Sequence, residues 1–564
     1  TLSMKSIKQF LNSQQTSVLS AATLIMIMII ASRLLGLVRQ RVLANFFGPG
    51  DLSLFFAAFR LPDLIFEVLV YGTFASAFIP VFTKALKDKE RNVWEIASSI
   101  TNIGVLVFSV LALIVMFFAN HLYGILTPGF SLEHRDQIVV LSKILFAAQG
   151  FFVISYVLTA VLESSRRFFM PAVAPLFYNL GIILGTIFFS PKLGLMGPVI
   201  GVVIGAFSHA AVQLPLAIKL GFRFSFKIRV SQDVKKIGRL SLPRVIEVIF
   251  LQVVKSVELL LASLISTAAY TYYTFGNSLQ LLPVGLFGTS IAKAALPTLS
   301  RLSDNKEEFR KTLFNALYQV SFVVLPAASI LMVLRIPLVR LVFGTNLFDW
   351  GSTVQTGLVV SAFGVGVIFQ VVNSILARAF YALHNTKTPV IVSISCITLN
   401  IILDFILIKV FKLPVWGLAA AFSLASFIQS LVLFILMVKK IYQNFPLRIL
   451  LPFIKSALAS LGSGMVMFFI LKFFDRSVWV KRLSFLGKID LDRSIPFEKF
   501  VLNTQYGVNL LMLTLMTIAV GVITYILLSL LFKSGELKFF AGYLRRIFVS
   551  KKVSPLPTDP LDNI

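Results

Sequence analysis

Long apolar runs alternate with short polar segments along almost the whole chain. A helix needs about 20 apolar residues to cross the hydrocarbon core of a bilayer. The pattern therefore predicts an all-α polytopic membrane protein with about fourteen transmembrane helices. The predicted spans are 17–47, 52–83, 93–119, 137–163, 168–190, 196–219, 236–265, 267–298, 312–334, 353–383, 388–410, 415–438, 449–472 and 506–532.

An internal repeat relates the first six predicted spans to the next six. Three landmarks recur at spacings of 217, 218 and 220 residues, namely Pro80 with Pro297, Pro171 with Pro389, and Gly197 with Gly417. Because six spans separate each pair, the two halves have the same orientation in the membrane, as in transporters built from parallel repeats. We expect two six-helix lobes followed by two C-terminal helices.

This plan predicts the domain organisation of the chain. The expected parts are an N-terminal segment at 1–16, an N-lobe at 17–221, a C-lobe at 222–440, the last two spans at 441–533 with a long external loop at 473–505, and a tail at 534–564.

Charge is scarce and unevenly distributed. Only 13% of the 564 residues are charged, about half the fraction of a soluble protein, yet the net formal charge is +28. Basic residues gather in alternate loops, and the positive-inside rule assigns these loops to the cytoplasm. We expect a multi-pass protein of the cytoplasmic (inner) membrane with both termini in the cytoplasm. The basic excess then indicates contact with anionic membrane lipids, and we expect no nucleic-acid partner.

Ionisable residues also occur inside the apolar runs. The second span carries a stripe within about 60° of helix surface, and the seventh carries one within about 80°. The stripes comprise Arg60, Asp63, Glu67 and Tyr71, and Arg244, Glu247, Lys255 and Glu258; Arg33 and Arg39 add positive charge on the first span. Such residues usually face a bundle interior or a watery cavity. One interpretation is a set of structural ion pairs, with Arg39 and Arg41 reaching to the surface; the other is a cavity that binds a phosphate or pyrophosphate.

Several stretches resemble the MurJ (MviN) family of lipid II flippases, in the multidrug/oligosaccharidyl-lipid/polysaccharide exporter superfamily. They are "ASRLLGLVRQ", "AAFRLPDLIFEVLVYGTFASAFIP", "TPGF", "PAVAPLFYNLGIILG", "LVRLVFG" and "ARAFYALHNTKTPV". The resemblance implies a fourteen-helix fold with a central cationic cavity, and a groove beside the last two helices for the undecaprenyl tail. It implies lipid II, an undecaprenyl-pyrophosphate-linked sugar peptide, as the substrate. It places Arg33, Arg39 and Arg60 on basic positions of the cavity.

The chain departs from the family pattern at four positions. Phe66 replaces a basic residue, Asn277 and Ser278 replace an acidic–basic pair on the eighth span, and Leu281 replaces an acidic residue. We expect Asn277 and Ser278 to be neutral polar residues of the cavity. Arg244 and Lys255 of the seventh span are our candidates to replace the missing pyrophosphate contacts.

A second candidate site lies in the predicted C-lobe. Asn400 and Asp404 are four residues apart and share one face of the eleventh span. Two oxygen ligands suit a hard cation, and the resemblance implies sodium held between helices 7, 11 and 12, with Glu258 in the helix 7 position. The alternatives are an Asp404 that is hydrogen-bonded to its neighbours or paired with Lys255. We expect no other cofactor.

The sequence favours a transporter over an enzyme. It contains no GxSxG, Gly-rich phosphate loop or HExxH motif. The predicted function is lipid II transfer to the outer leaflet by alternating access, in a monomer, through a lateral gate between spans 1 and 8. Gly36, Gly72, Gly285 and Gly288 are expected to let spans 1, 2 and 8 bend or pack closely. The alternatives are flipping of another undecaprenyl-linked glycan, a drug–cation antiporter, which the arginines disfavour, or a non-transporting membrane scaffold.

Overall fold

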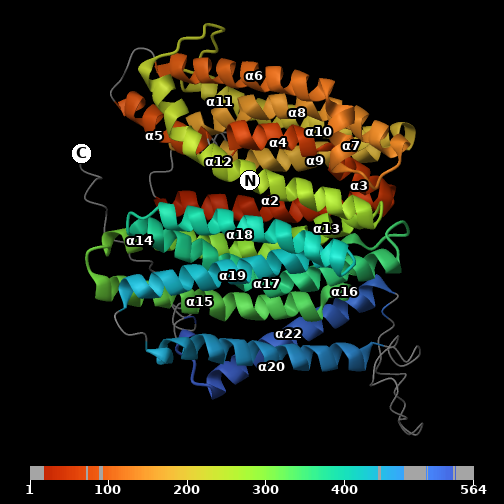
Figure 1. Ribbon diagram of the computed structural model, residues 1–564, viewed down its shortest axis with the longest axis vertical. Coiled ribbons are helices and arrows are strands. Elements are labelled where there is room, and N and C mark those ends of the chain that lie inside the picture. The colour runs from red at the N-terminus through yellow and green to blue at the C-terminus, as the bar shows by residue number, and fades with distance from the viewer. Residues whose placement is uncertain are drawn as a thin grey trace, which may run out of the picture. The chain divides into compact units, whose positions relative to one another are not determined.

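The computed structural model describes residues 18–71, 74–87, 93–442, 446–475, 504, 506–537 and 540. The elements in these ranges are helices (Figure 1). Eleven helical segments are long and apolar enough to cross a membrane. This confirms the predicted all-α membrane fold.

Each of the fourteen predicted spans consists mainly of helix where the structure describes it. Twelve correspond to α2 (Val18–Phe46), α6 (Val93–Phe117), α8 (Leu132–Ser164), α9 (Phe169–Leu193), α10 (Met196–Ala211) with α11 (Leu214–Lys219), α12 (Gln232–Ile265), α15 (Lys306–Val333), α17 (Trp350–Ala382), α18 (Lys387–Phe405) with η3 (Ile406–Val410), α19 (Trp416–Ile441), η4 (Leu447–Leu450) with α20 (Leu451–Phe474), and α22 (Gly507–Leu531). Two short helices, α7 (Ala119–Leu126) and α16 (Arg335–Phe343), connect longer ones.

The second and eighth spans are broken at matching places. The second consists of α3 (Pro49–Ala58), α4 (Arg60–Phe66), the π-helical η1 (Glu67–Tyr71) and α5 (Phe74–Lys87). The eighth consists of α13 (Ala269–Pro283), the π-helical η2 (Val284–Thr289) and α14 (Ser290–Arg301). The π segments start 217 residues apart, at Glu67 and Val284, which is one of the spacings of the sequence repeat. Gly285 and Gly288 lie in η2, Gly72 lies outside the described residues, and α2 runs unbroken past Gly36. The bending expected at these glycines stays a prediction.

Proline chemistry accounts for the break that precedes Arg60. Pro62 has no backbone N–H, so the carbonyl four residues earlier, that of Ala58, loses its usual helical donor. Phe59 falls between α3 and α4, and its N–H bonds back to Phe56 in a tighter turn. Such interruptions of a helix commonly mark functional positions.

The helices fall into two units. The first unit comprises residues up to 282 together with 338–366 and 387–429. Within it α10 packs along both α9 and α8, and α2 packs on α9 (Figure 1). Glycines allow the closest approach: a Cβ on Gly181 of α9 would lie 2.5 Å from the Cα of Gly205 on α10, and one on Gly201 would lie 2.6 Å from the Gly181 carbonyl oxygen. This is the small-residue contact by which membrane helices pack.

The second unit comprises residues 283–337, 367–386 and 430 onward. Here α20 packs on both α15 and α22. The hydroxyl of Tyr525 on α22 donates to the Phe322 carbonyl of α15 at 2.7 Å, and Ser463 of α20 donates to the Gly521 carbonyl at 2.7 Å. Polar side chains thus find backbone acceptors between helices that offer little hydrophobic driving force in lipid.

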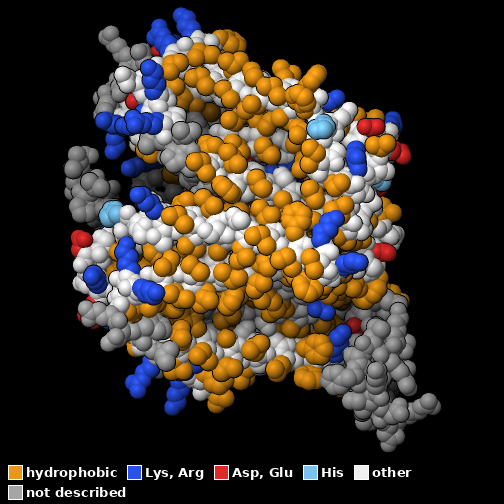
Figure 2. Space-filling model, in the orientation of Figure 1, with side chains coloured by type: hydrophobic (Ala, Val, Ile, Leu, Met, Phe, Trp, Pro, Cys, Tyr) orange, Lys and Arg blue, Asp and Glu red, His pale blue; other side chains and the backbone are white. Residues whose placement is uncertain are grey.

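Large apolar side chains are exposed on these helices, as lipid contact requires. Figure 2 shows hydrophobic side chains across most of the visible face, with lysine and arginine mainly toward its two sides. Phe117, Phe188 and Leu515 are among the exposed residues. An apolar surface of this extent would be unstable in water and is expected for a protein in a bilayer.

Candidate functional site

Arg60 is buried inside the first unit, with only 4% of its surface exposed. It is the first residue of α4, directly after the break at Phe59. Its Nη2 donates a hydrogen bond to Oε1 of Gln252 on α12. Among the described residues no carboxylate lies within 4 Å of its guanidinium nitrogens, and its buried Nε has no hydrogen-bond partner. The Arg60 guanidinium therefore has no carboxylate counter-charge among these residues and has at least one unused donor.

Gln252 connects Arg60 to an ion pair between the second and seventh spans. Its Nε2 donates to Oε2 of Glu67, the first residue of η1. Nζ of Lys255, one turn further along α12, lies 2.8 Å and 3.0 Å from the two Glu67 oxygens. The structure thus brings together three of the predicted site residues, Arg60, Glu67 and Lys255, around one buried amide.

Asp63 faces a different helix. Its Oδ1 accepts a hydrogen bond of 2.5 Å from Nε2 of Gln149 on α8. Asp63 lies on the same stripe as Arg60 and Glu67. Its position around the helix axis differs from theirs, so its side chain bonds to α8, whereas that of Arg60 bonds to α12. Tyr71, Arg244 and Glu247 were predicted for the same cavity, and their side chains lie outside the described residues.

The two arginines of the first span are partly exposed on α2. Nε of Arg33 is buried without a hydrogen-bond partner among the described residues. Within the described part of the chain neither Arg33 nor Arg39 forms an ion pair. No hydrogen bond there joins them to the Arg60 cluster, which comprises Arg60, Gln252, Glu67 and Lys255. Their role in binding remains a prediction.

The neutral pair of the eighth span lies on α13 and is held by hydrogen bonds. Ser278 Oγ accepts from Nε2 of Gln40 on α2 at 2.6 Å and donates to the Thr274 carbonyl at 2.9 Å. Asn277 Oδ1 accepts from Nε2 of Gln280 at 2.8 Å. Ser278 thus fixes α13 to α2 in this conformation.

The predicted cation ligands lie on α12 and α18, which pack on each other. Asp404 and Asn400 are buried, and Nδ2 of Asn400 donates to Oδ2 of Asp404 at 3.3 Å. The Oδ1 atoms of both residues are buried without a hydrogen-bond partner in the described structure. Glu258 is 8% exposed, and its Oε1 accepts from the Tyr273 hydroxyl at 2.5 Å.

Of the two alternatives for Asp404, the pairing with Lys255 is not found among the described residues, whereas the hydrogen bond with a helix neighbour is present and comes from Asn400. Lys255 forms its ion pair with Glu67 instead. Two orphaned oxygens, one on an amide and one on a carboxylate, remain available, and they are ligands of the kind that hard cations prefer. The ligation of sodium by Glu258, Asn400 and Asp404 stays a prediction.

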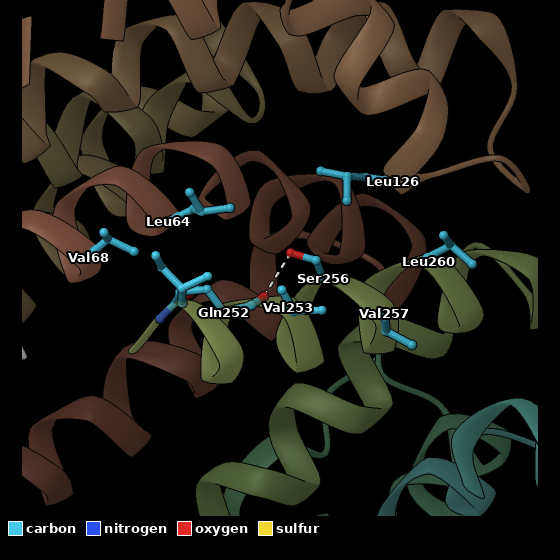
Figure 3. Close-up of a pocket in the computed structure, with 9 residues that line it drawn as sticks. Leu64, Val68, Leu126, Gln252, Val253, Ser256, Val257 and Leu260 are labelled. Carbon is cyan, nitrogen blue, oxygen red and sulfur yellow. Dashed lines mark hydrogen bonds between the residues drawn. The ribbon is translucent and has the colours of Figure 1, made fainter. Parts of the chain in front are cut away.

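An apolar pocket adjoins the Arg60 cluster (Figure 3). Leu64 and Val68 of the second span and Leu126 of α7 line it together with residues of α12. Gln252 and Ser256 are its polar members, and the Ser256 hydroxyl donates to the Gln252 backbone carbonyl at 2.9 Å. Gln252 thus lies between this apolar space and the charged groups of Arg60, Glu67 and Lys255.

Three polar partners escaped the sequence analysis, namely Gln252, Gln149 and Tyr273. They carry no charge, so a search for ionisable residues in apolar runs passes over them. The position of Gln252, three residues before Lys255 on one helix face, was the available signal.

A bundle of apolar helices with a buried arginine that has no carboxylate partner among the described residues is an architecture expected of a membrane transport protein. The fold resembles the inward-facing conformation of a multidrug resistance MATE family transporter of the MOP superfamily, with a TM-score of 0.61 over 73% of this chain and 94% of that one, at 13% identity. The chain belongs to the family "Lipid II flippase MurJ", whose model matches residues 43–487. This is a transporter family and not an enzyme family.

Individual relatives agree with this membership. The chain is 29% identical to a probable lipid II flippase MurJ of Vibrio cholerae over 435 residues, which are 74% of this chain and 82% of that protein. It is 28% identical to the lipid II flippase MurJ of Thermosipho africanus over 470 residues, covering 82% and 93%. A solved structure, "Lipid II flippase MurJ, inward closed conformation", matches with a TM-score of 0.72 at 26% identity, over 93% of this chain and all of that one. The chain is therefore a multi-pass protein of the inner membrane.

Proposed function

We propose that this protein moves lipid II from the cytoplasmic to the outer leaflet by alternating access. Family membership supports this assignment. The observation that locates the binding site is the burial of Arg60, which is 4% exposed and has no carboxylate partner among the described residues. A buried guanidinium is costly unless a counter-charge joins it. The pyrophosphate of lipid II supplies that charge and matches the planar donor geometry of arginine.

Arg33 and Arg39 complete the proposed pyrophosphate site from α2. Lys255 contributes to pyrophosphate binding only when its ion pair with Glu67 opens, because its ammonium group is bonded to that carboxylate in this conformation. Arg244 is its companion from the same helix. The sugar–peptide head then crosses a polar cavity lined by Asn277 and Ser278, while the undecaprenyl tail stays in lipid.

A sodium ion is part of the proposal. Glu258, Asn400 and Asp404 would hold it, and the orphaned Oδ1 atoms of Asn400 and Asp404 support the fit. The ion would supply positive charge to two buried carboxylates and link its binding to the position of α12 against α18. We also propose that the protein acts as a monomer, with both termini in the cytoplasm and its basic loops on anionic lipid.

Complementation of a cell depleted of its own lipid II flippase tests the proposal. We expect the wild-type chain to restore growth and Arg60→Ala or Arg33→Ala to fail at normal protein level. A charge-assisted hydrogen bond in a dry cavity is worth about 1.5–3 kcal/mol. Arg60→Lys should rescue only in part, because lysine lacks the planar fork.

Arg229→Ala is the matched control. It removes an arginine whose ion pair with Glu95 is exposed, and such pairs contribute little. Failure of the wild-type chain at normal membrane level would overturn lipid II as the substrate. Full growth with both Arg33→Ala and Arg60→Ala would overturn the assignment of the site.

A further inference from the structure

The side chain of Gln252 is buried between two groups of opposite charge. Only 2% of its surface is exposed. Its Oε1 accepts from Arg60, and its Nε2 donates to Glu67. Arginine can only donate and a carboxylate can only accept, so a single orientation of the amide satisfies both neighbours.

The amide also separates the two charges. Arg60 and Glu67 lie on the same span and both reach Gln252, yet the ion pair of Glu67 is with Lys255 and not with Arg60. The neighbouring carboxylate Asp63 is bonded to Gln149 on α8. Each described acidic group near Arg60 therefore has another partner.

We propose that Gln252 is a positioning residue that keeps Glu67 from pairing with Arg60 and so keeps the guanidinium available to a phosphate-bearing lipid. A carboxylate attached to the same chain would compete with any incoming anion, because charge-assisted bonds to guanidinium are strong. A neutral amide holds the guanidinium in place without neutralising it. Lys255 assists by occupying Glu67 from the other side. This inference rests on the proposed function, because it concerns the same arginine.

A double-mutant cycle on the purified full chain tests the inference. The readout is binding of undecaprenyl pyrophosphate, measured by native mass spectrometry, with undecaprenol as the uncharged reference ligand. Gln252→Met keeps the side-chain length but removes both amide functions, so Glu67 becomes free to pair with Arg60. We expect roughly 10-fold weaker binding of the pyrophosphate, the effect of losing one charge-assisted bond, and unchanged binding of undecaprenol.

The Glu67→Gln background separates positioning from simple packing. If Gln252 acts by holding Glu67 away, Gln252→Met has no further effect on pyrophosphate binding once Glu67 is neutral. The same fold loss in both backgrounds would overturn the inference, since a packing defect is additive with the neutralisation. Leu251→Ala, at the exposed neighbour of Gln252 on α12, is the control for local disturbance and should bind like the wild type.

Two further variants protect the interpretation. Arg60→Ala must abolish the preference for the pyrophosphate over undecaprenol; if it does not, the proposed binding site fails, whatever Gln252 does. If Gln252→Met does not fold, Gln252→Asn replaces it in the cycle, because its amide is one methylene too short to bridge both groups. Unchanged binding by a folded Gln252 variant, with Arg60→Ala impaired, would overturn the role of Gln252 alone.

Discussion

Replacing Asp404 by asparagine should remove a sodium-dependent part of the stability of this protein. Asp404 is fully buried, and its Oδ1 and that of Asn400 have no hydrogen-bond partner in the described structure. Asp404→Asn keeps the volume and the bond to Asn400, but it removes the negative charge that a hard cation needs. The wild type should therefore unfold at a higher temperature in sodium than in potassium or choline, and the variant should not.

The size of the effect follows from ligand linkage. A ligand that binds only the folded state stabilises it by RT ln(1 + [L]/Kd). For a Kd of about 10 mM and about 100 mM sodium, this is roughly 1.4 kcal/mol. In a chain of this length such a gain raises the melting temperature by roughly 1–3 °C. Differential scanning fluorimetry at constant ionic strength resolves a shift of this size.

Controls separate ion loss from general damage. Glu258→Gln neutralises the second carboxylate and should also lose the sodium shift, whereas Glu307→Gln neutralises an exposed one, paired with Lys311, and should keep it. A wild type that melts equally in sodium and choline would refute the reasoning. So would an Asp404→Asn variant with the full sodium shift, because the orphaned carboxylate oxygen would then have no part in binding.

Two further predictions concern parts of the molecule away from the charges. Gly201→Ala should destabilise the packing of α9 on α10 by roughly 1–3 kcal/mol, because its Cβ would lie 2.6 Å from the Gly181 carbonyl oxygen; Gly238→Ala, where nothing lies within 4 Å, should be neutral or slightly stabilising in the same melting assay. At the start of α17, hydrogen bonds from Ser352 lower the pKa of Asp349. A lowered pKa means that Asp349 stabilises the fold above its unfolded value of about 3.9 and loses that effect as the pH falls through its folded value. The melting temperatures of the wild type and Asp349→Asn should thus differ at pH 7 and converge toward pH 3; a constant difference would contradict the prediction.

The helices could be predicted from the sequence because their physical cause is local. A run of about 20 apolar residues has few options in a bilayer other than a helix. The repeat was visible in the sequence, and the π segments of spans 2 and 8, which start at Glu67 and Val284, follow its spacing, but that these two spans would be interrupted together was not predicted. The positions of the breaks were harder to predict, because a proline such as Pro62 is accommodated in some membrane helices and interrupts others.

The partners of the charges could not be predicted in the same way. Periodicity placed Arg60, Asp63 and Glu67 on one stripe, but their contacts depend on which helix packs against each part of it. Arg60 meets Gln252, which is 192 residues away in sequence, and Asp63 meets Gln149 on another helix. A helical wheel contains no information about either neighbour.

A neutral residue, Gln252, lies at the centre of these charges. In lipid a bare ion pair between Arg60 and Glu67 would satisfy both groups and leave no site for an anion. Gln252 accepts from the first and donates to the second, so it lowers the cost of burying each without cancelling either charge. Lys255 then neutralises Glu67 alone. If Arg60 binds the pyrophosphate as proposed, the site must keep its charge while empty and yet release the ligand, and an amide between opposite charges meets both requirements better than a carboxylate does.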